Sequence, residues 1–215
     1  MKAQQPNVSN YKVCINKRYG TLSAENCRVQ VSIGNPKYEG EKFVALMEWA
    51  NRRYKRIDVI VSDTLQRHNL PEPDSAATWN KTRHEGLAWI KRNRRALQGT
   101  GLVMWDDLLV HPAYKAATNE IANAVKMTAV WDEIENTARQ FARRNGSSIA
   151  ASTDFLLEEL AVFSVIFQHP AIDVYAGSWI SNIFDVLQEK VPVFNNIRCL
   201  QVDFERKRTA ELKAA

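Results

Sequence analysis

Two apolar strand patterns separated by a helical pattern constrain the fold of this chain more than any other feature of its sequence. Residues 28–33 and 56–62 are short runs rich in β-branched residues, which predict strands. Between them, the apolar residues of 39–54 recur at helical spacing, which predicts a helix with one buried face. A strand, a helix and a strand in this order predict a parallel crossover. We therefore expect an α/β fold with a Rossmann-like beginning but without a glycine-rich phosphate loop.

The rest of the sequence extends this pattern into a single α/β domain over residues 1–215, a length that suits one domain with a sizeable core. We expect the ends, 1–10 and 206–215, to be flexible. Further strands are predicted over 11–15, 102–109, 172–175 and 197–204, and the strand over 102–109 is expected to be interrupted at 106–107. Further helices are predicted over 76–98, 112–145 (one or two helices on the outside), 152–167 and 181–189.

Ser32 ends the first of these strands and is followed by a turn. The sequence continues with Gly34, Asn35 and Pro36, which favour a turn before the helix. Ligands of open α/β sheets bind at the carboxyl ends of the strands, so a serine in this place is a candidate nucleophile. Serine and asparagine also cap helices without any chemistry, and the elbow of hydrolases is absent because Gln30 replaces its first glycine. Ser32 therefore needs support from elsewhere in the chain.

Tyr175 ends a second strand in a similar way. The strand predicted over 172–175 finishes in this polar side chain, and Ala176 and Gly177 follow it as the beginning of a turn. We expect the polar strand ends of the sheet, Ser32 and Tyr175 among them, to gather on one edge.

The helix predicted over 152–167 carries two acidic residues in an otherwise apolar sequence. Its Phe, Leu, Val and Ile residues leave no polar face, so we expect it to be buried on most sides. Glu158 and Glu159 are costly to bury unless a cation pairs with them. That cation is either a structural Arg or Lys or the ammonium group of a ligand. Phe155 and Glu159 are four residues apart and therefore share a face of the helix.

The helix predicted over 76–98 has a basic segment near its end. Its apolar stripe, which we expect to face the core, is Leu87, Ile90 and Leu97. Its clustered basic residues are Lys91, Arg92, Arg94 and Arg95. A charge run of this kind is usually a solvated helix face. The absence of interleaved acidic residues and the net charge of +5 favour a polyanionic partner instead, and both interpretations stay open at this point.

The composition argues against several classes of protein. No stretch approaches the ~18 apolar residues that span a bilayer, and residues 1–10 contain no apolar signal core. The cysteines Cys14, Cys27 and Cys199 are odd in number and lack metal-ligand spacing, which is typical of a reducing compartment. We therefore expect a cytoplasmic protein with no membrane segment and no bound metal.

Four segments, taken together in their order and spacing, carry a resemblance to a known family. They span most of the chain, and no single one of them is decisive. The segments are VSIGNPKYEGEKF at 31–43, DTLQRHN at 63–69, FLLEEL at 155–160 and VYAG at 174–177. With these segments the sequence resembles the tRNA-dependent cyclodipeptide synthases.

This resemblance implies a fold, a reaction and partners. The fold is a single Rossmann-like domain with a mostly parallel sheet flanked by helices, similar to the catalytic domains of class I tyrosyl- and tryptophanyl-tRNA synthetases. The activity is that of an aminoacyltransferase that joins the aminoacyl groups of two aminoacyl-tRNAs into a cyclic dipeptide, a 2,5-diketopiperazine. No ATP, metal or other cofactor is implied, because the aminoacyl ester is already activated. We expect a monomer whose partners are its two aminoacyl-tRNA substrates, with no membrane.

The resemblance also implies roles for five residues. Ser32 matches the catalytic serine that carries first an aminoacyl and then a dipeptidyl group as a covalent ester. Glu159 matches the glutamate that binds the α-ammonium of the first aminoacyl group. Tyr175 matches the tyrosine that orients this group and relays a proton through the substrate amine. Asn35 and Phe155 match substrate-binding positions, and Phe155 stands where many members have tyrosine.

These residues do not assign the chain to one branch of the family. One branch has Asn, Tyr and His in its signature, and the other has a variable residue, Tyr and Pro. The corresponding residues here are Asn35, Tyr175 and Ala176, which match neither signature completely, although the context of 31–40 is closer to the second branch.

The resemblance gives the basic segment a partner as well. Its position matches the basic helix that holds the tRNA acceptor arm in the family, which implies that tRNA is bound by Lys91, Arg92, Arg94 and Arg95. Phosphate contacts position an RNA without reading its sequence, so the two amino acids must be chosen by pockets that the sequence does not name.

Two alternatives compete with this interpretation. A noncatalytic tRNA- or RNA-binding Rossmann-like protein would keep the basic segment and use Ser32 only as a cap. A serine acyltransferase or hydrolase of small esters would need a histidine as base, and none of the available histidines has a sequence relation to Ser32 that forces this role. The histidines are His68, His84, His111 and His169.

Overall fold

The strand, helix and strand that begin the fold form as the hydrophobic pattern predicts. In the computed structural model, β2 (Asn26–Ser32) and β3 (Arg56–Ser62) are parallel neighbours joined by α1 (Gly40–Asn51). Ser32 and Ser62 are paired in this register, so both strands end at the same level of the sheet. The residues that the structure describes are 9–21, 23–177 and 180–207.

Within these residues, six strands form one mostly parallel sheet in the order β1-β6-β5-β2-β3-β4. The pairs from β6 to β4 are parallel, and β1 lies antiparallel to β6 at one edge. This arrangement confirms the predicted Rossmann-like α/β fold. The remaining strands are β1 (Tyr11–Tyr19), β4 (Gly101–Met104), β5 (Ile172–Tyr175) and β6 (Cys199–Arg206).

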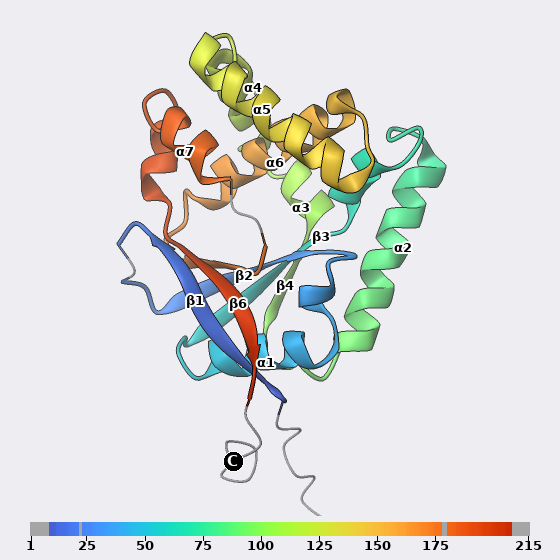
Figure 1. Ribbon diagram of the computed structural model, residues 1–215, viewed down its shortest axis with the longest axis vertical. Coiled ribbons are helices and arrows are strands. Elements are labelled where there is room, and N and C mark those ends of the chain that lie inside the picture. Colours follow the sequence, from blue (N-terminus) through green and yellow to red (C-terminus); the bar gives the residue numbers. More distant parts are fainter. Residues whose placement is uncertain (1–8, 22, 178–179, 208–215) are drawn as a thin grey trace, which may run out of the picture.

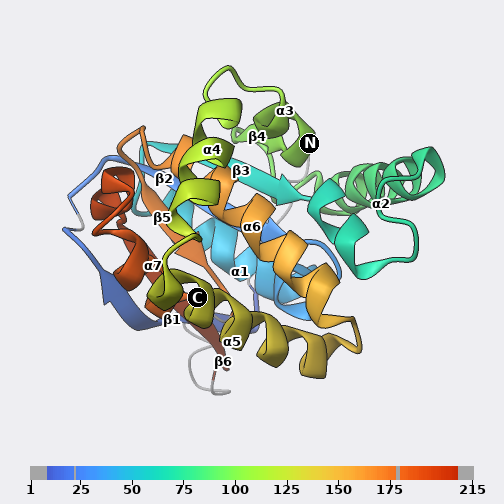
Figure 2. The same cartoon turned by 90° about the horizontal axis from the view of Figure 1, so that it is seen from above.

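Helices cover both faces of the sheet, α1 and α2 on one side and α3 to α7 on the other (Figures 1 and 2). Successive side chains of β3 point to opposite faces of the sheet. Val59 and Val61 pack in the core under α1, whereas Ile60 packs in the core under α6. The helices are α2 (Ala76–Asn93), α3 (Trp105–Leu109), α4 (Tyr114–Ala124), α5 (Thr128–Asn145), α6 (Ile149–Ile166) and α7 (Ser181–Leu187). Three short 3₁₀ helices are η1 (Pro36–Tyr38), η2 (Thr64–Asn69) and η3 (Pro192–Asn196).

The apolar helix predicted over 152–167 is α6, and it is the centre of the second core. It lies between the sheet and an outer layer formed by α4 and α5, which place the apolar residues Ile121, Ile134 and Ala138 against it (Figure 2). Burial on most sides is confirmed for its second half, where Leu160 and Val162 are fully buried. α6 thus carries side chains into the layer directly above the sheet.

The prediction of a strand over 102–109 is wrong in its second half. β4 ends at Met104, and Trp105 to Leu109 form the short helix α3. The Asp107 carboxylate accepts a hydrogen bond from the Met104 amide at 3.1 Å, which caps the helix at the point where the strand stops. The two aspartates that were expected to interrupt a strand instead begin a helix.

The apolar stripe predicted for the helical segment 76–98, which contains α2, is wrong for Leu87 only, because Leu97 is buried in the core under α1 and Ile90 packs against that core. Leu87 is 59% exposed, whereas Gly86 and Trp89 are buried and face the sheet side. A Cβ atom on Gly86 would lie 2.5 Å from the Cβ of Asp63, so the absence of a side chain lets the helix approach the end of β3. The helix also ends at Asn93 instead of 98. The buried face therefore also includes small and polar residues that a hydrophobic pattern does not reveal.

Most of the two termini expected to be flexible, 1–8 and 208–215, lies outside the described residues. Where the ends are described they run together, because the Lys207 amide donates to the carbonyl of Asn10 at 2.9 Å. No helix among the described residues combines the length and the apolar character needed to cross a membrane.

Candidate active site

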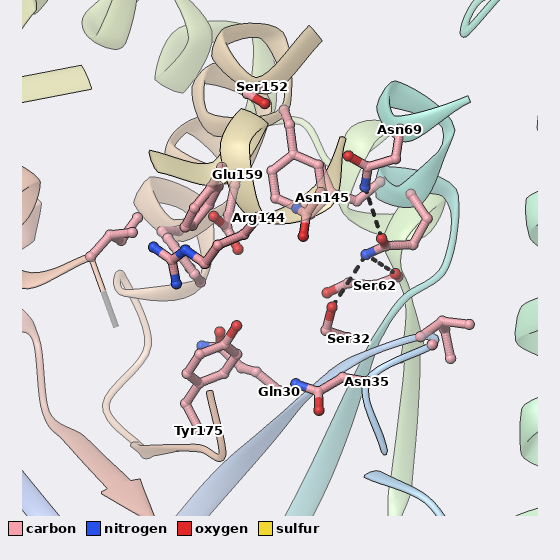
Figure 3. A pocket seen from close by; sticks show the side chains of 18 residues that line it. Gln30, Ser32, Asn35, Ser62, Asn69, Arg144, Asn145, Ser152, Glu159 and Tyr175 are labelled. Carbon is pink, nitrogen blue, oxygen red and sulfur yellow. Dashed lines mark hydrogen bonds between the residues drawn. The ribbon is translucent and has the colours of Figure 1, made fainter. Parts of the chain in front are cut away.

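A cavity of about 500 Å³ opens at the carboxyl ends of the central strands, below α5 and α6 and beside η2 (Figure 3). Five residues singled out by the sequence line it together, although they come from segments more than a hundred residues apart. These are Ser32, Asn35, Phe155, Glu159 and Tyr175. The expected gathering of polar strand ends on one edge is therefore present in the structure.

Ser32 is the last residue of β2 and is half-buried at the cavity wall. A turn follows at once, because the Asn35 amide donates to the Ser32 carbonyl at 3.2 Å. Gly34 adopts a φ of 87° in this turn, a left-handed conformation that favours glycine. The chain therefore leaves the sheet immediately after Ser32, and the Ser32 side chain lies at the cavity (Figure 3).

Asn35 has a structural task in addition to its place in the cavity wall. Its Oδ1 accepts a hydrogen bond from the Lys37 amide at 3.0 Å and caps η1. The helix-cap interpretation of this stretch is therefore correct for Asn35, while the Ser32 side chain makes no such cap bond.

Tyr38 supports the site from outside the cavity lining, and no role was predicted for it from the sequence. It is fully buried, and its hydroxyl accepts a hydrogen bond at 2.7 Å from the backbone amide of Ala176. The Tyr38 ring lies 6.4 Å from the ring of Tyr175, measured between centroids. Tyr38 thus joins the segment that follows Ser32 to the segment that follows Tyr175. A lone tyrosine in a turn carries no sequence signal for this role.

Tyr175 ends β5 and contributes its ring to the cavity. Burial, followed by the nearby Glu159 carboxylate, raises the pKa of the Tyr175 phenol well above its ordinary value. The phenol is therefore protonated at neutral pH. Gly177 packs on the ring so closely that a Cβ atom there would lie 2.6 to 2.9 Å from three ring and hydroxyl atoms.

The two glutamates of α6 have different surroundings. Glu158 accepts hydrogen bonds from both terminal nitrogens of Arg67, from Trp105 Nε1 at 2.9 Å, and lies 3.2 Å from His68 Nε2. Burial alone would raise the pKa of Glu158, but the hydrogen bonds and charges of Arg67 and His68 lower it to about 2. Glu158 is therefore the glutamate with a structural ion pair.

Glu159 faces the cavity instead (Figure 3). Within the part of the chain that the structure describes, its carboxylate has no hydrogen bond and no ion pair. Burial raises the pKa of Glu159 to about 8, although the cavity leaves the side chain in partial contact with solvent. Arg144 of α5 lines the same cavity and is labelled near Glu159 in Figure 3, so a ligand cation that enters would meet a buried carboxyl and a guanidinium together.

Phe155 forms part of an aromatic wall. Its ring lies 6.4 Å from the rings of Phe141 and His68, measured between centroids, in edge-to-face geometry. Apolar side chains from other elements complete this wall, whereas most of the remaining lining residues are polar. The apolar residues are Ile33, Leu65, Phe141, Phe155, Phe163 and Ile180.

The floor of the cavity is polar and rigid. Gln30 lines it and donates from Nε2 to Asp173 at 3.0 Å, and Asp173 in turn forms a buried, two-point ion pair with Arg28. Arg28 also donates to the backbone carbonyls of Ile166 and His169, which ties the end of α6 to the sheet. The sequence did not predict this role for any of these residues. Gln30 was noted only because it replaces the first glycine of the hydrolase elbow.

None of the four histidines lines the cavity, and all four belong to the described residues. His68 is the neighbour in sequence of the lining residue Asn69, but its ring nitrogen Nε2 lies 3.2 Å from Glu158, which is outside the lining. A serine–histidine mechanism therefore has no base in this cavity. Among the described residues, no group of three His, Cys, Asp or Glu side chains could hold a metal ion.

The basic segment lies outside the cavity, at the exposed end of α2 and in the turn after it. Arg92 donates a hydrogen bond to Glu39, the residue before α1, at 2.9 Å. The positive charge of the basic segment is therefore partly compensated by an acidic residue from another part of the chain. The structure does not bring the four basic side chains together with Ser32. It places their helix beside the segment that follows Ser32.

Comparisons with known proteins identify the fold. No protein-family model matches the sequence, and a search of curated proteins finds no match. Among solved structures, a cyclodipeptide synthase from Fluoribacter dumoffii superposes with a TM-score of 0.79 at 20% identity, covering 92% of this chain and 99% of that one. One from Staphylococcus haemolyticus gives 0.70 at 13% identity, covering 93% and 100%.

The tyrosyl-tRNA synthetase of Archaeoglobus fulgidus, solved with L-tyrosine, is a more distant neighbour. It superposes with a TM-score of 0.56 at 13% identity, covering 82% of this chain and 54% of the synthetase. The chain therefore has the fold that cyclodipeptide synthases share with the catalytic domain of class I aminoacyl-tRNA synthetases.

Proposed function

We propose that this chain is an aminoacyltransferase of the cyclodipeptide synthase type, which joins two aminoacyl groups from aminoacyl-tRNAs into a 2,5-diketopiperazine. The observation that carries this proposal is the meeting of Ser32, Glu159 and Tyr175 in one cavity. A hydroxyl nucleophile, a carboxyl group that faces the cavity and a protonated phenol are suited to the transfer of an aminoacyl ester. The shared fold supports the same reaction class.

In the first step, Ser32 Oγ attacks the carbonyl carbon of the first aminoacyl ester. A new ester bond forms to Oγ, the bond to the ribose oxygen breaks, and the serine proton ends on that oxygen as the tRNA leaves. The amine of the aminoacyl group on Ser32 then attacks the ester carbonyl of the second aminoacyl-tRNA. An amide bond forms, the bond to the ribose oxygen breaks, the amine proton leaves with the tRNA, and the dipeptidyl group stays on Ser32. Attack by its free amine closes the ring and regenerates Ser32.

Glu159 is proposed to bind the α-ammonium group of the first aminoacyl group. Burial raises the pKa of this carboxyl to about 8. An ammonium group that hydrogen-bonds to the carboxyl would lower this pKa again and favour the ionised form of Glu159. Binding energy at the ammonium group orients the ester toward Ser32. Phe155 and Asn35 are proposed to contact the same aminoacyl group.

Tyr175 is proposed to position the aminoacyl group and to relay protons. Its raised pKa makes the phenol a hydrogen-bond donor and a poor base at neutral pH. The substrate amine is the better proton carrier, and Tyr175 holds it in place. No residue in this scheme requires a metal or a cofactor.

The exposed residues Lys91, Arg92, Arg94 and Arg95 are proposed to bind the tRNA phosphates. Their helix adjoins Glu39, in the segment that begins at Ser32, so an RNA on this surface would approach the mouth of the cavity. Such contacts hold the tRNA without selecting its sequence.

The test is incubation with charged tRNA followed by mass spectrometry of the protein and of the small products. The proposal expects an aminoacyl adduct on Ser32 and a diketopiperazine, both absent in Ser32→Ala with the folded state retained by circular dichroism. Absence of adduct and product from the wild type, together with retained tRNA binding, would establish the noncatalytic RNA-binding alternative. Product profiling in an expressing host identifies the two amino acids.

A further inference from the structure

We propose that Gln66 is an additional catalytic residue, whose side-chain amide donates a hydrogen bond to Ser32 Oγ and stabilises the negative charge that develops there. This inference rests on the proposed role of Ser32 as nucleophile. It does not depend on which aminoacyl groups are joined.

The geometry of Gln66 provides the first argument. Its Nε2 lies 3.3 Å from Ser32 Oγ and 3.4 Å from the Ser62 carbonyl oxygen, and both Gln66 and Ser32 line the cavity. The dashed line that ends at Ser32 in Figure 3 marks the first of these contacts. The bond to Oγ is long for a hydrogen bond, as such bonds often are before substrate is bound.

The orientation of the amide is fixed by its other contacts. A carbonyl oxygen only accepts, so the Gln66 atom that faces Ser62 must be the nitrogen. The opposite atom, Oε1, accepts from Asn69 Nδ2 at 3.1 Å. Each end of the amide therefore has a partner consistent with one orientation, and that orientation points an N–H group at Ser32.

The backbone that carries Gln66 is held by Glu158. Gln66 lies in η2 next to Arg67 and His68, and both of these side chains contact the Glu158 carboxylate. Arg67 additionally stacks on the ring of Trp79, with 4.2 Å between its guanidinium carbon and the ring centroid. η2 is thereby anchored to α6, the helix that carries Glu159. One helix thus positions both the proposed ammonium anchor and, through Glu158, the proposed donor to the nucleophile.

The donor acts at two points of the reaction. When Oγ attacks the ester and loses its proton, the N–H group stabilises the charge on Oγ; the new carbon–Oγ bond then removes that charge. When the dipeptide cyclises, the same bond breaks, the electron pair returns to Oγ, and the proton comes from the attacking amine. The N–H group again faces a developing alkoxide. Loss of Gln66 should therefore slow both loading and release of Ser32.

The first experiment measures acylation of Ser32 by a small activated ester, p-nitrophenyl acetate, which transfers its acetyl group to Oγ and releases nitrophenolate. Gln66→Met removes the amide at similar size, and Gln168→Met is the matched control at an exposed glutamine outside the cavity. We expect Ser32 acetylation, located by mass spectrometry, to fall about tenfold to a hundredfold in Gln66→Met. The control should equal the wild type. Equal rates in Gln66→Met and the wild type would overturn the proposal.

A second variant separates charge stabilisation from a purely structural effect. Gln66→Glu places an acceptor-only carboxylate beside Oγ at neutral pH and regains an O–H donor when it is protonated. The ratio of its acetylation rate to that of the wild type should rise as the pH is lowered from 8 to 5. A ratio that is constant with pH would show that Gln66 only fills space, and would reject the inference.

The third measurement is the single-turnover rate of aminoacyl transfer from charged tRNA to Ser32. Gln66→Met should lower this rate by a similar factor without weakening tRNA binding. Absence of aminoacyl transfer in the wild type, with the acetylation difference intact, would refute the proposed function and leave the Gln66 inference standing. Transfer in both proteins at the same rate would refute the inference alone.

Discussion

Glu158 and Glu159 are neighbours on α6 whose pKa values are shifted in opposite directions, to about 2 and about 8. The first carboxylate is held by Arg67, His68 and Trp105, and the second faces the cavity. Adjacent positions on a helix point about 100° apart, so a step of one residue along α6 separates a structural ion pair from a candidate ligand anchor. The two carboxyl groups should therefore change the free energy of unfolding in different pH ranges.

Glu159→Gln is expected to stabilise the protein at high pH and to leave it unchanged at low pH. Folding raises the pKa of Glu159 from 4.5 to about 8, so the stability contributed by its protonated form is present below 4.5 and is lost as the pH rises through 8. At pH 9 the free energy of unfolding of Glu159→Gln should exceed that of the wild type by about 2 to 4 kcal/mol.

Urea denaturation of both proteins at pH 5 and pH 9 measures this difference. Glu120→Gln, at an exposed position, is the control and should show no pH-dependent gap. A Glu159→Gln gap of the same size at both pH values would contradict the raised pKa.

Glu158→Gln is expected to destabilise the protein by about 3 kcal/mol at pH 7, because it leaves the Arg67 guanidinium buried without its counter-charge. Here folding lowers the pKa from 4.5 to about 2, so the stabilisation is present above 4.5 and is lost as the pH falls through 2. The two proteins should therefore converge in acid.

Chemical denaturation at pH 7 and pH 3 tests this expectation. The matched control is Glu135→Gln, which removes an exposed ion pair to Arg139 and should cost less than about 0.5 kcal/mol. Equal losses in the two variants would mean that the Glu158 cluster does not anchor η2.

Gly177→Ala is expected to lower diketopiperazine formation at least tenfold while leaving most of the protein folded. The added Cβ would lie 2.6 Å from a ring carbon of Tyr175, so the ring must move away from its place in the cavity. Overpacking of this kind costs about 1 to 3 kcal/mol of stability. Product yield and thermal unfolding are compared with those of Tyr175→Phe, and full activity in Gly177→Ala would show that the position of the ring is unimportant.

Arg92→Glu together with Arg95→Glu is expected to weaken tRNA binding and to flatten its dependence on salt. Each lost phosphate contact should reduce the slope of log K against log salt by about 0.7 to 0.9. The slope is measured by filter binding of tRNA at salt concentrations from about 50 to about 200 mM. Lys17→Glu, an exposed charge on β1, is the control. An unchanged slope would return the basic segment to an ordinary solvated helix face.

The sequence predicted the sheet well because its signals are local. The strand–helix–strand unit, the strand that ends at Tyr175 and the buried helix α6 all follow from periodicity and β-branched runs. The prediction failed where packing overrides pattern. In α2 the buried face is set by Gly86 against Asp63, a contact between distant segments, and Leu87 is left exposed.

The candidate site was predicted only in part for a related reason. Ser32 and Tyr175 are visible because they end strands, and Glu159 because it interrupts an apolar helix. Gln66 and Tyr38 act through single hydrogen bonds across the fold, to Ser32 and to Ala176, and a glutamine or tyrosine near a turn has many ordinary explanations. Such pairs become apparent only when the tertiary contacts are known.

The hydrogen bond between Tyr38 and the Ala176 amide limits how this chain can be recombined with its structural relatives. Position 176 supports the site through its backbone, so a histidine there retains the donor that Tyr38 uses. Proline removes it and leaves a fully buried hydroxyl without its partner. A chimera that receives a tyrosine–proline segment at 175 and 176 would therefore have to replace Tyr38 as well. The two positions form one exchangeable unit, although 138 residues separate them.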